Sequence, residues 1–225
     1  MKKKLTIGIG IPTIGMLHWR FAADFMALQL PTDTKVFWQT RTMIDTARNA
    51  LVDKVLQDKD ITHLLMIDDD MTFESDMLIK MLERDVDIIG ALAFKRTDDF
   101  RPCVYKLKEG TNDHFSILPT AFQEVDAVGT GGMLIKREVL EAIETPLFET
   151  WYAKDGTDKH WSVDFDFCIK AKAAGYKIHV DPAIKMGHIG EAPVITEQSF
   201  LQKLHDKQKQ DASIKNNSDG TNKNG

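Results

Sequence analysis

Short apolar segments alternate with segments of helical periodicity through the first 95 residues, and this alternation constrains the fold more than any other feature. The pattern predicts strands at 5–11, 35–39, 64–67 and 86–94, and helices at 21–30, from Ile44 onward and at 75–84. Uninterrupted apolar strands that alternate with helices are typical of a mostly parallel sheet covered by helices on both faces. Ligands bind such sheets beyond the carboxyl ends of the strands. The loops after Ile11, Gln39 and Ile67 are therefore expected to meet at one crevice.

The second half of the chain has a more mixed pattern. It predicts strands at 101–107, 123–128, 133–136 and 176–180, and helices at 137–143 and 163–174. No linker or repeat interrupts residues 1–200, so we expect one domain over 1–205, with a first half at about 1–95 and a second at 96–205. Residues 206–225 are rich in Lys, Asn, Asp and Ser and predict a disordered polar tail.

Composition limits the classes of function. The net charge of −5, from 29 basic and 34 acidic residues, gives no basic footprint for nucleic acid. An anionic substrate would instead need a local positive charge, such as a bound cation. Cys103 and Cys168 form no CxxC motif, which favours a reducing compartment, the cytoplasm. No stretch approaches the roughly 18–20 apolar residues that cross a bilayer.

The acidic triplet Asp68-Asp69-Asp70 directly follows a predicted buried strand. Carboxylates crowded at a strand end raise the cost of ionisation, and a divalent cation removes this cost while gaining hard oxygen ligands. A solvated turn is the alternative. A calcium loop is excluded, because Phe73 and Ile79 stand where that loop needs Gly and Glu.

Three further features are candidates for chemistry. The glycines 129, 131 and 132 would let backbone approach a ligand closely, or would form only a tight turn. Asp164 stands at the start of a predicted helix, where a carboxylate either stabilises the helix end or acts as a general base. His188, flanked by Gly187 and Gly190, is a candidate metal ligand or a structural histidine.

These features occur in the order LLMIDDDMTF, VGTGGMLIKREVLEAI, VDFDFCIKAKAAGYKIHVDP and GHIG. In this combination the chain resembles the family 2 glycosyltransferases and their close GT-A relatives, from about residue 5 to residue 190. The segment TARNALV at 46–52 also matches the stretch that the family places before its acidic motif. The resemblance implies a single GT-A-type domain, with a nucleotide-sugar-binding half at 1–95 and an acceptor-binding, catalytic half at 96–205.

The resemblance also implies roles for individual residues. Asp68 and Asp70 would form the D-x-D motif that holds Mn²⁺ or Mg²⁺ against the donor diphosphate, and His188 would complete the metal shell. Trp161 would lie near the acceptor. Asp164 would be the catalytic base, with Asp166 in reserve. The implied donor-binding residues are Pro12, Thr13, Arg48, Asp68, Asp69, Gly131 and Gly132.

Two positions depart from the family pattern. Val163 replaces the Glu that precedes the base, which removes a hydrogen-bonding group on the acceptor side. The segment Gln39-Thr40-Arg41 lacks the acidic residue that many uracil-binding members carry after the second strand. A UDP-sugar remains the favoured donor over a GDP-sugar, and the acceptor is expected to be a hydroxyl of a glycan or of another molecule.

The expected activity is metal-dependent transfer of a sugar, with inversion, from a nucleotide-diphosphate sugar. A sugar nucleotidyltransferase is an alternative, but such enzymes use a basic glycine-rich loop after the first strand, and no Lys or Arg lies between Lys4 and Arg20. A non-catalytic nucleotide-sugar-binding module is the second alternative, which Val163 favours. Stereochemistry, acceptor and homo-oligomer formation stay open.

Overall fold

The computed structural model describes residues 4–97, 99–108, 114–152, 160–190 and 194–220. In the first half it contains β1 (Ile7–Thr13), α1 (Trp19–Ala27), β2 (Thr34–Thr40), α2 (Ile44–Gln57), β3 (His63–Ile67), β4 (Met71–Phe73), α3 (Met77–Glu83) and β5 (Ile88–Leu92). The second half contains β6 (Val104–Leu107), β7 (His114–Ser116), β8 (Gln123–Val125), β9 (Ala127–Val128), β10 (Gly132–Lys136), α4 (Arg137–Ala142), β11 (Trp151–Tyr152), β12 (His160–Trp161), α5 (Val163–Ala173), β13 (Ile178–His188) and α6 (Glu197–Gly220).

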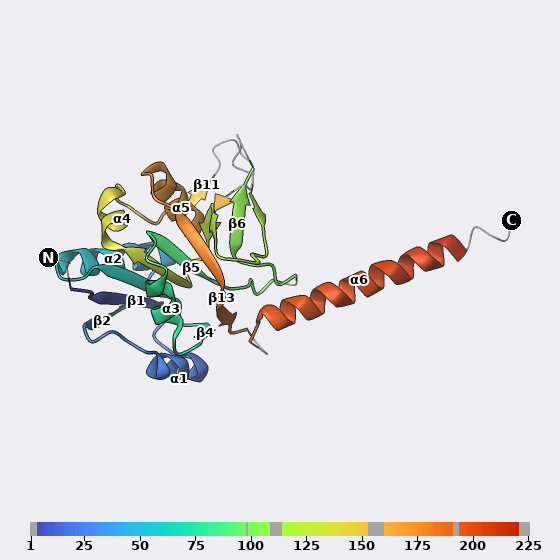
Figure 1. Cartoon of the computed structure of the whole chain (residues 1–225), viewed down its shortest axis with the longest axis horizontal. Coiled ribbons are helices and arrows are strands. Elements are labelled where there is room, and N and C mark those ends of the chain that lie inside the picture. The colour runs from blue at the N-terminus through green and yellow to red at the C-terminus, as the bar shows by residue number, and fades with distance from the viewer. Residues whose placement is uncertain (1–3, 98, 109–113, 153–159, 191–193, 221–225) are drawn as a thin grey trace.

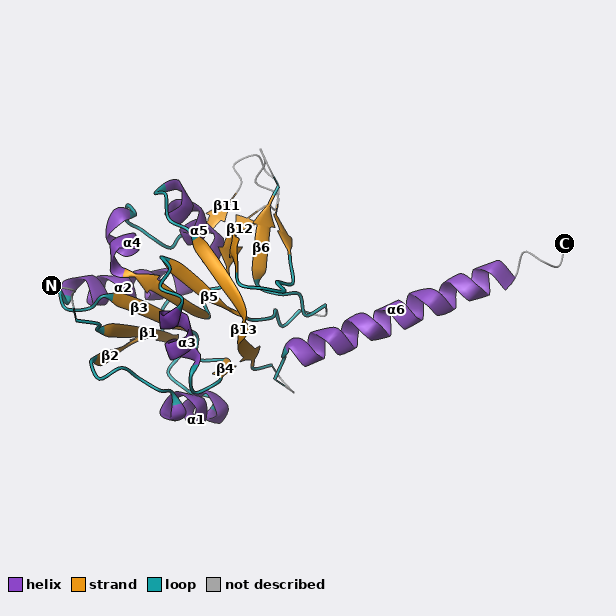
Figure 2. Ribbon diagram, in the orientation of Figure 1, coloured by secondary structure: helices purple, strands orange, loops and turns teal. Residues whose placement is uncertain are grey.

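The central sheet has eight strands in the order β2-β1-β3-β10-β5-β13-β4, with β8 also paired to β13. Strands β2, β1 and β3 pair in parallel, as do β5 and β13. Strand β10 lies antiparallel to both of its neighbours, β3 and β5. The prediction of a mostly parallel mixed α/β sheet is therefore confirmed, with β10 antiparallel at its centre and both β4 and β8 antiparallel to β13. Figure 2 shows the strands of this sheet between the helices.

Helices cover both faces of this sheet, and each face has its own hydrophobic core. Successive strand residues point to opposite faces, so Leu64 and Met66 of β3 join a core with α2, α4 and α5. Leu65 and Ile67 join the core under α1 and α3. Figure 1 shows these helices on either side of the strands.

Strand β13 is longer than the predicted strand at 176–180 and continues to His188. Its first half pairs with β5, and its last residues pair with β4, where His188 lies opposite Met71. The extension carries His188 to the loop that follows β3. A separate small sheet of β7, β6 and β9 stands beside the main sheet.

Residues 206–220, which were expected to belong to a disordered polar tail, lie in α6 in this structure. The helix projects away from the globular part (Figure 1). Its first turn is anchored, because the ring of Phe200 stacks on Phe94 at 5.4 Å between centroids. Beyond this anchor, the sequence is rich in Lys and Gln, which have high helix propensity and are seldom buried. No helix within the described ranges is both long and apolar enough to cross a membrane.

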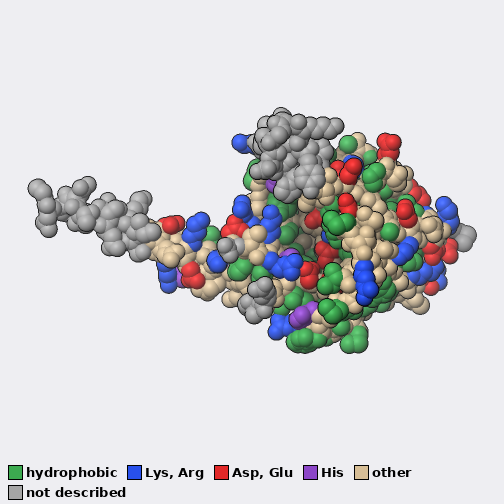
Figure 3. All heavy atoms as spheres, turned by 180° about the vertical axis from the view of Figure 1, so that it is seen from behind, with side chains coloured by type: hydrophobic (Ala, Val, Ile, Leu, Met, Phe, Trp, Pro, Cys, Tyr) green, Lys and Arg blue, Asp and Glu red, His purple; other side chains and the backbone are tan. Residues whose placement is uncertain are grey.

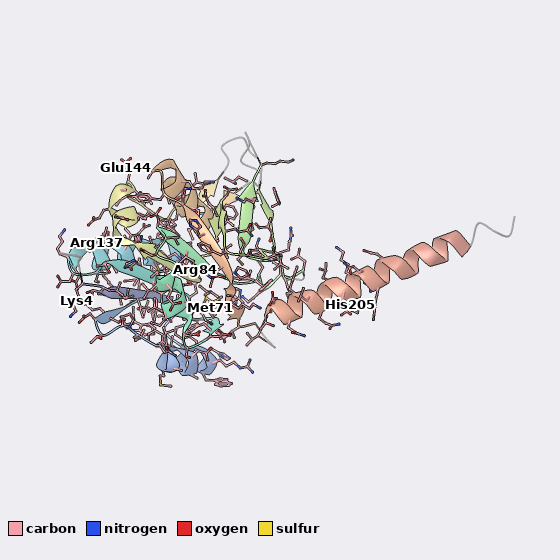
Figure 4. All side chains as sticks on the ribbon, in the orientation of Figure 1. Lys4, Met71, Arg84, Arg137, Glu144 and His205 are labelled. Carbon is pink, nitrogen blue, oxygen red and sulfur yellow. The ribbon has the colours of Figure 1, made fainter. Side chains whose placement is uncertain are left out.

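Arg137, at the start of α4 (Figure 4), ties this helix to the end of α2. Its side chain is buried and donates to four backbone carbonyls, those of Val55 (3.3 Å), Leu56 (2.7 Å), Asp58 (2.7 Å) and Ile61 (3.1 Å). The last carbonyls of a helix have no partner within the helix. The carbonyls of Val55 and Asp58 also accept a backbone N–H, and Arg137 adds a charged donor to all four carbonyls.

We expect Arg137→Met to lower the free energy of unfolding by about 2–4 kcal/mol, because buried carbonyls lose a charged donor. Urea denaturation measures this change. The matched control is Arg101→Met, whose side chain is 64% exposed, and we expect that variant to stay within about 0.5 kcal/mol of wild type. Equal stabilities of the two variants would contradict this role of Arg137.

Candidate functional site

Three segments meet at the carboxyl edge of the sheet: the loop after β3, the glycine loop before β10, and the start of α5. The backbone N–H of Asp68 donates to the carbonyl of Gly131 at 3.2 Å. Next to them, β1 and β2 end side by side, where Arg41 donates its N–H to the carbonyl of Thr13 at 3.2 Å. The face opposite to that of Figure 1 is hollowed near the middle of the globular part, and acidic side chains gather around the hollow (Figure 3).

Arg48 of α2 lies at the centre of this site and is only 3% exposed. Its Nη2 donates to both carboxylate oxygens of Asp68, at 3.2 and 3.1 Å. Its Nη1 pairs with Oδ1 of Asp164, which also accepts a 2.6 Å hydrogen bond from the Thr130 hydroxyl. Burial alone would lower the pKa of Arg48, but the charges of Asp164 and Asp68 outweigh burial and raise it. One buried cation therefore joins the acidic loop to α5.

Ionisation of the buried Asp68 carboxyl group is unfavourable, and Arg48 only partly compensates for this. Burial raises its pKa, Arg48 opposes this change, and the negative charges of Asp164 and Asp70 add to it, so the net shift is upward. This is the carboxylate crowding expected from the triplet. The site accordingly favours additional positive charge.

Asp70 and His188 form a second pair beside this cluster. The Nδ1 of His188 lies 2.9 Å from the carbonyl oxygen of Phe94. A carbonyl only accepts, so Nδ1 is assigned the proton. Nε2 lies 3.3 Å from Oδ2 of Asp70. These two atoms can share a proton or bind one cation.

Arg96 and the backbone fix the position of Asp70. Arg96 pairs with its Oδ2 at 3.1 Å and also donates to the carbonyl of Ile189 at 3.2 Å. The N–H of Ile189 in turn donates to the Asp70 carbonyl at 2.8 Å. Burial raises the pKa of Asp70, but the hydrogen bond and charge of His188 and the charge of Arg96 outweigh it, so the net shift is downward.

The carboxylate of this pair is a ligand type that suits Mn²⁺ or Mg²⁺, whereas the imidazole suits a transition metal better than Mg²⁺. Asp70 offers a carboxylate oxygen, and His188 offers an imidazole nitrogen whose other nitrogen is held by a carbonyl, as is common for metal-ligating histidines. Within the described ranges, no three His, Cys, Asp or Glu side chains are grouped closely enough to hold a metal by themselves. Mg²⁺ often takes one or two carboxylates and fills its shell with substrate phosphates and water. A metal here would need such ligands.

The two glycines assigned to the donor sugar differ in their surroundings. A Cβ on Gly131 would lie 3.3 Å from Oδ2 of Asp68, so Gly131 borders the acidic site. A Cβ on Gly132 would lie 2.0 Å from the sulfur of Met186, so this glycine packs against a core side chain that a larger residue would displace.

The remaining assigned residues are distributed as follows. Pro12 is buried and Thr13 half-buried at the end of β1. Asp69 is half-buried, and its Oδ2 has no hydrogen-bond partner among the described residues. Asp166 turns to Lys170 of its own helix, at 2.6 Å. The backbone of Trp161 forms part of β12, and its side chain lies outside the described part of the chain.

Sequence reasoning missed Thr130, Arg96 and the carbonyl of Phe94. Thr130 stands inside the glycine cluster, and its burial at 0% exposure was not readable from that cluster. Arg96 follows the predicted strand at 86–94, and its position at a strand end was a usable signal. A backbone carbonyl leaves no signature in a sequence.

No protein-family model and no curated protein sequence matches this chain. Solved structures match its fold. A197 from STIV aligns with a TM-score of 0.58 and 20% identity, over 87% of this chain and 92% of that chain. GalNAc-T7, in a crystal structure with UDP, GalNAc and Mn²⁺, aligns with a TM-score of 0.56 and 12% identity, over 91% of this chain. This chain spans only 48% of the GalNAc-T7 chain. The likeness establishes a mixed α/β fold similar to that of GT-A glycosyltransferases.

The raised pKa of Asp68 predicts a pH dependence of stability. The folded chain binds this proton more tightly than the unfolded chain, so the contribution of Asp68 to the free energy of unfolding falls as pH rises from about 3.8 through the raised pKa. In Asp68→Asn this decline is absent. Urea unfolding of both proteins from about pH 4 to pH 7 should show that the free energy of unfolding of Asp68→Asn rises relative to that of wild type as pH rises. Asp53→Asn, an exposed change on α2, should track wild type, and a constant difference between wild type and Asp68→Asn would contradict the prediction.

Proposed function

We propose that this protein is a metal-dependent glycosyltransferase that uses a nucleotide-diphosphate-sugar donor. One observation carries the proposal: Nε2 of His188 lies 3.3 Å from the Asp70 carboxylate, beside the buried Arg48 that joins Asp68 to Asp164. A pair of metal-binding side chains and a positioned carboxylate thus share one edge of an α/β sheet. The likeness to GalNAc-T7, whose structure contains UDP, GalNAc and Mn²⁺, supports this proposal.

The donor would bind at the carboxyl ends of β1, β2 and β3. Pro12 and Thr13 would line the nucleotide pocket, and Asp68, Asp69, Gly131 and Gly132 would lie near the diphosphate and the sugar. Asp70 and His188 would hold Mn²⁺ or Mg²⁺, which supplies Lewis-acid stabilisation of the charge on the departing nucleoside diphosphate. A UDP-sugar is the favoured donor. Arg48 is buried and paired on both sides, so in this proposal it positions Asp68 and Asp164.

Asp164 is the proposed general base. Its Oδ1 already accepts from Arg48 and Thr130, which leaves Oδ2 to take the proton of the acceptor hydroxyl. Oδ2 lies 3.9 Å from the place that a Cβ on Gly129 would occupy, so the glycine keeps this side uncrowded. The acceptor oxygen would bond to the anomeric carbon as the bond to the diphosphate breaks on the opposite face, which inverts that centre.

Asp166 is the weaker candidate for the base, because Lys170 pairs with its carboxylate. In this proposal Trp161 lies near the acceptor. The half at 1–95 binds the donor, and the half at 96–205 binds the acceptor. Cys103 and Cys168 are free thiols, in accord with the proposed cytoplasmic location.

A panel of nucleotide sugars incubated with Mn²⁺ tests the proposed activity without knowledge of the acceptor. Release of a nucleoside diphosphate by slow hydrolysis identifies the donor. Release of pyrophosphate from a nucleoside triphosphate and a sugar phosphate would instead identify a nucleotidyltransferase. Absence of both reactions across the panel, with donor binding retained, would identify a binding module.

We expect Asp70→Asn and His188→Gln each to weaken Mn²⁺ binding by about 10–100-fold or more, because each removes a ligand atom or its charge. Titration calorimetry measures the affinity, and Mn²⁺-dependent diphosphate release should fall in parallel. Asp76→Asn is the control, since this aspartate lies at the start of α3 and pairs with Lys80. Unchanged Mn²⁺ affinity in both site variants would refute the metal site.

We expect Asp164→Asn to keep the donor affinity of the wild-type protein but to slow transfer by about 10²–10⁴-fold, since the acceptor proton loses its base. Asp166→Asn is a matched control one half-turn along α5, and it should retain most of the activity. Donor binding and transfer are measured separately, by calorimetry and by product formation. If Asp166→Asn were the inactive variant, the two roles would be reversed.

A further inference from the structure

An apolar surface surrounds α1 and the loop before it. It consists of the side chains of Ile14, Met16, Leu17, Trp19, Met26 and Met43, which we call the α1 surface. Met26 is 82% exposed, Met16 76%, Ile14 74% and Trp19 69%. Hydrophobic side chains gather at the corresponding lower edge of the globular part in Figure 3. Large exposed apolar side chains gathered on one part of a surface are typical of sites of interaction with a protein or a membrane.

Helix α1 is apolar on both of its faces. Its inner face carries Phe21, which is fully buried and meets the ring of Phe73 edge-on at 6.0 Å. Trp19, Ala23 and Met26 recur at helical spacing on the outer face and are exposed. A surface helix of a soluble domain normally carries polar side chains outward. The outer face of α1 therefore lacks the partner that its composition requires.

Two arginines, Arg20 and Arg41, lie in the segments that carry this surface, although the whole chain carries −5. Residues 13–23 and 40–44 contain no Asp or Glu; Asp24 and Asp45 follow them, and the Asp24 carboxylate accepts the backbone N–H of Phe73 at 3.0 Å. The two segments adjoin, because the Arg41 N–H donates to the Thr13 carbonyl at 3.2 Å. Within the described ranges, neither arginine has an acidic partner, and Arg20 lies over the Trp19 ring at 5.3 Å.

We propose that the α1 surface docks this protein on a membrane that contains anionic lipids. Amphipathic helices that lie in a bilayer interface combine Trp and long apolar side chains with Arg at the rim, and anionic headgroups attract that rim. A second copy fits less well, because a symmetric contact would place each arginine-rimmed surface against its own copy. The surface begins where β1 and β2 end, so a docked chain presents the carboxyl edge of its sheet to the membrane.

Flotation of the full chain with lipid vesicles tests this inference. We expect binding to vesicles of phosphatidylcholine mixed with phosphatidylserine, and at least tenfold weaker binding to phosphatidylcholine alone. Trp19→Ser/Met26→Ser should lower binding to the mixed vesicles at least tenfold. Arg20→Gln/Arg41→Gln should also lower it about tenfold or more, and should remove most of its dependence on salt.

The matched control is Leu201→Ser/Leu204→Ser, which removes exposed apolar side chains of α6 and should bind mixed vesicles as wild type does. If Trp19→Ser/Met26→Ser unfolds, Ile14→Ser/Met16→Ser, which changes only the loop before α1, provides the same test of vesicle binding. Absence of wild-type binding, or equal binding by all variants, would overturn the inference. A dimer in light scattering that Trp19→Ser/Met26→Ser dissociates, without vesicle binding, would assign the surface to a second copy.

Discussion

The buried ion pairs of Arg48 organise the site. Arg48 stands in α2, Asp68 follows β3 and Asp164 begins α5, so one side chain joins three elements that are far apart in sequence. A buried guanidinium without partners would be strongly unfavourable, and its removal would leave two carboxylates facing each other. The relative positions of these elements are therefore linked to the charge balance of the site.

The antiparallel strand β10 explains why the glycine loop reaches the acidic triplet. Because β10 runs opposite to β3, its beginning lies beside the end of β3, with Gly132 opposite Ile67. The extension of β13 has a similar effect, since it carries His188 back to Met71. The site thus combines residues from both halves of the chain, and Phe94, whose carbonyl holds His188, also supports the first turn of α6 through Phe200.

The candidate site and the α1 surface share one edge of the sheet. Thr13 ends β1, and the exposed apolar loop starts at the next residue. A protein arranged in this way can meet a small polar ligand and an extended apolar surface on the same side. This arrangement distinguishes the chain from a domain with a polar rim around its site.

The sequence by itself determined the strand and helix alternation, the mostly parallel sheet and the place of Asp68–Asp70 at a strand end, because apolar periodicity is a local property. Only the tertiary structure decided that β10 runs antiparallel, that β13 reaches His188 and that residues 206–220 continue a helix. It also decided that Asp164 pairs with Arg48 whereas Asp166 pairs with Lys170. Two residues apart on a helix, these side chains point about 200° apart, and the packing of α5 against the core decides which of them faces Arg48.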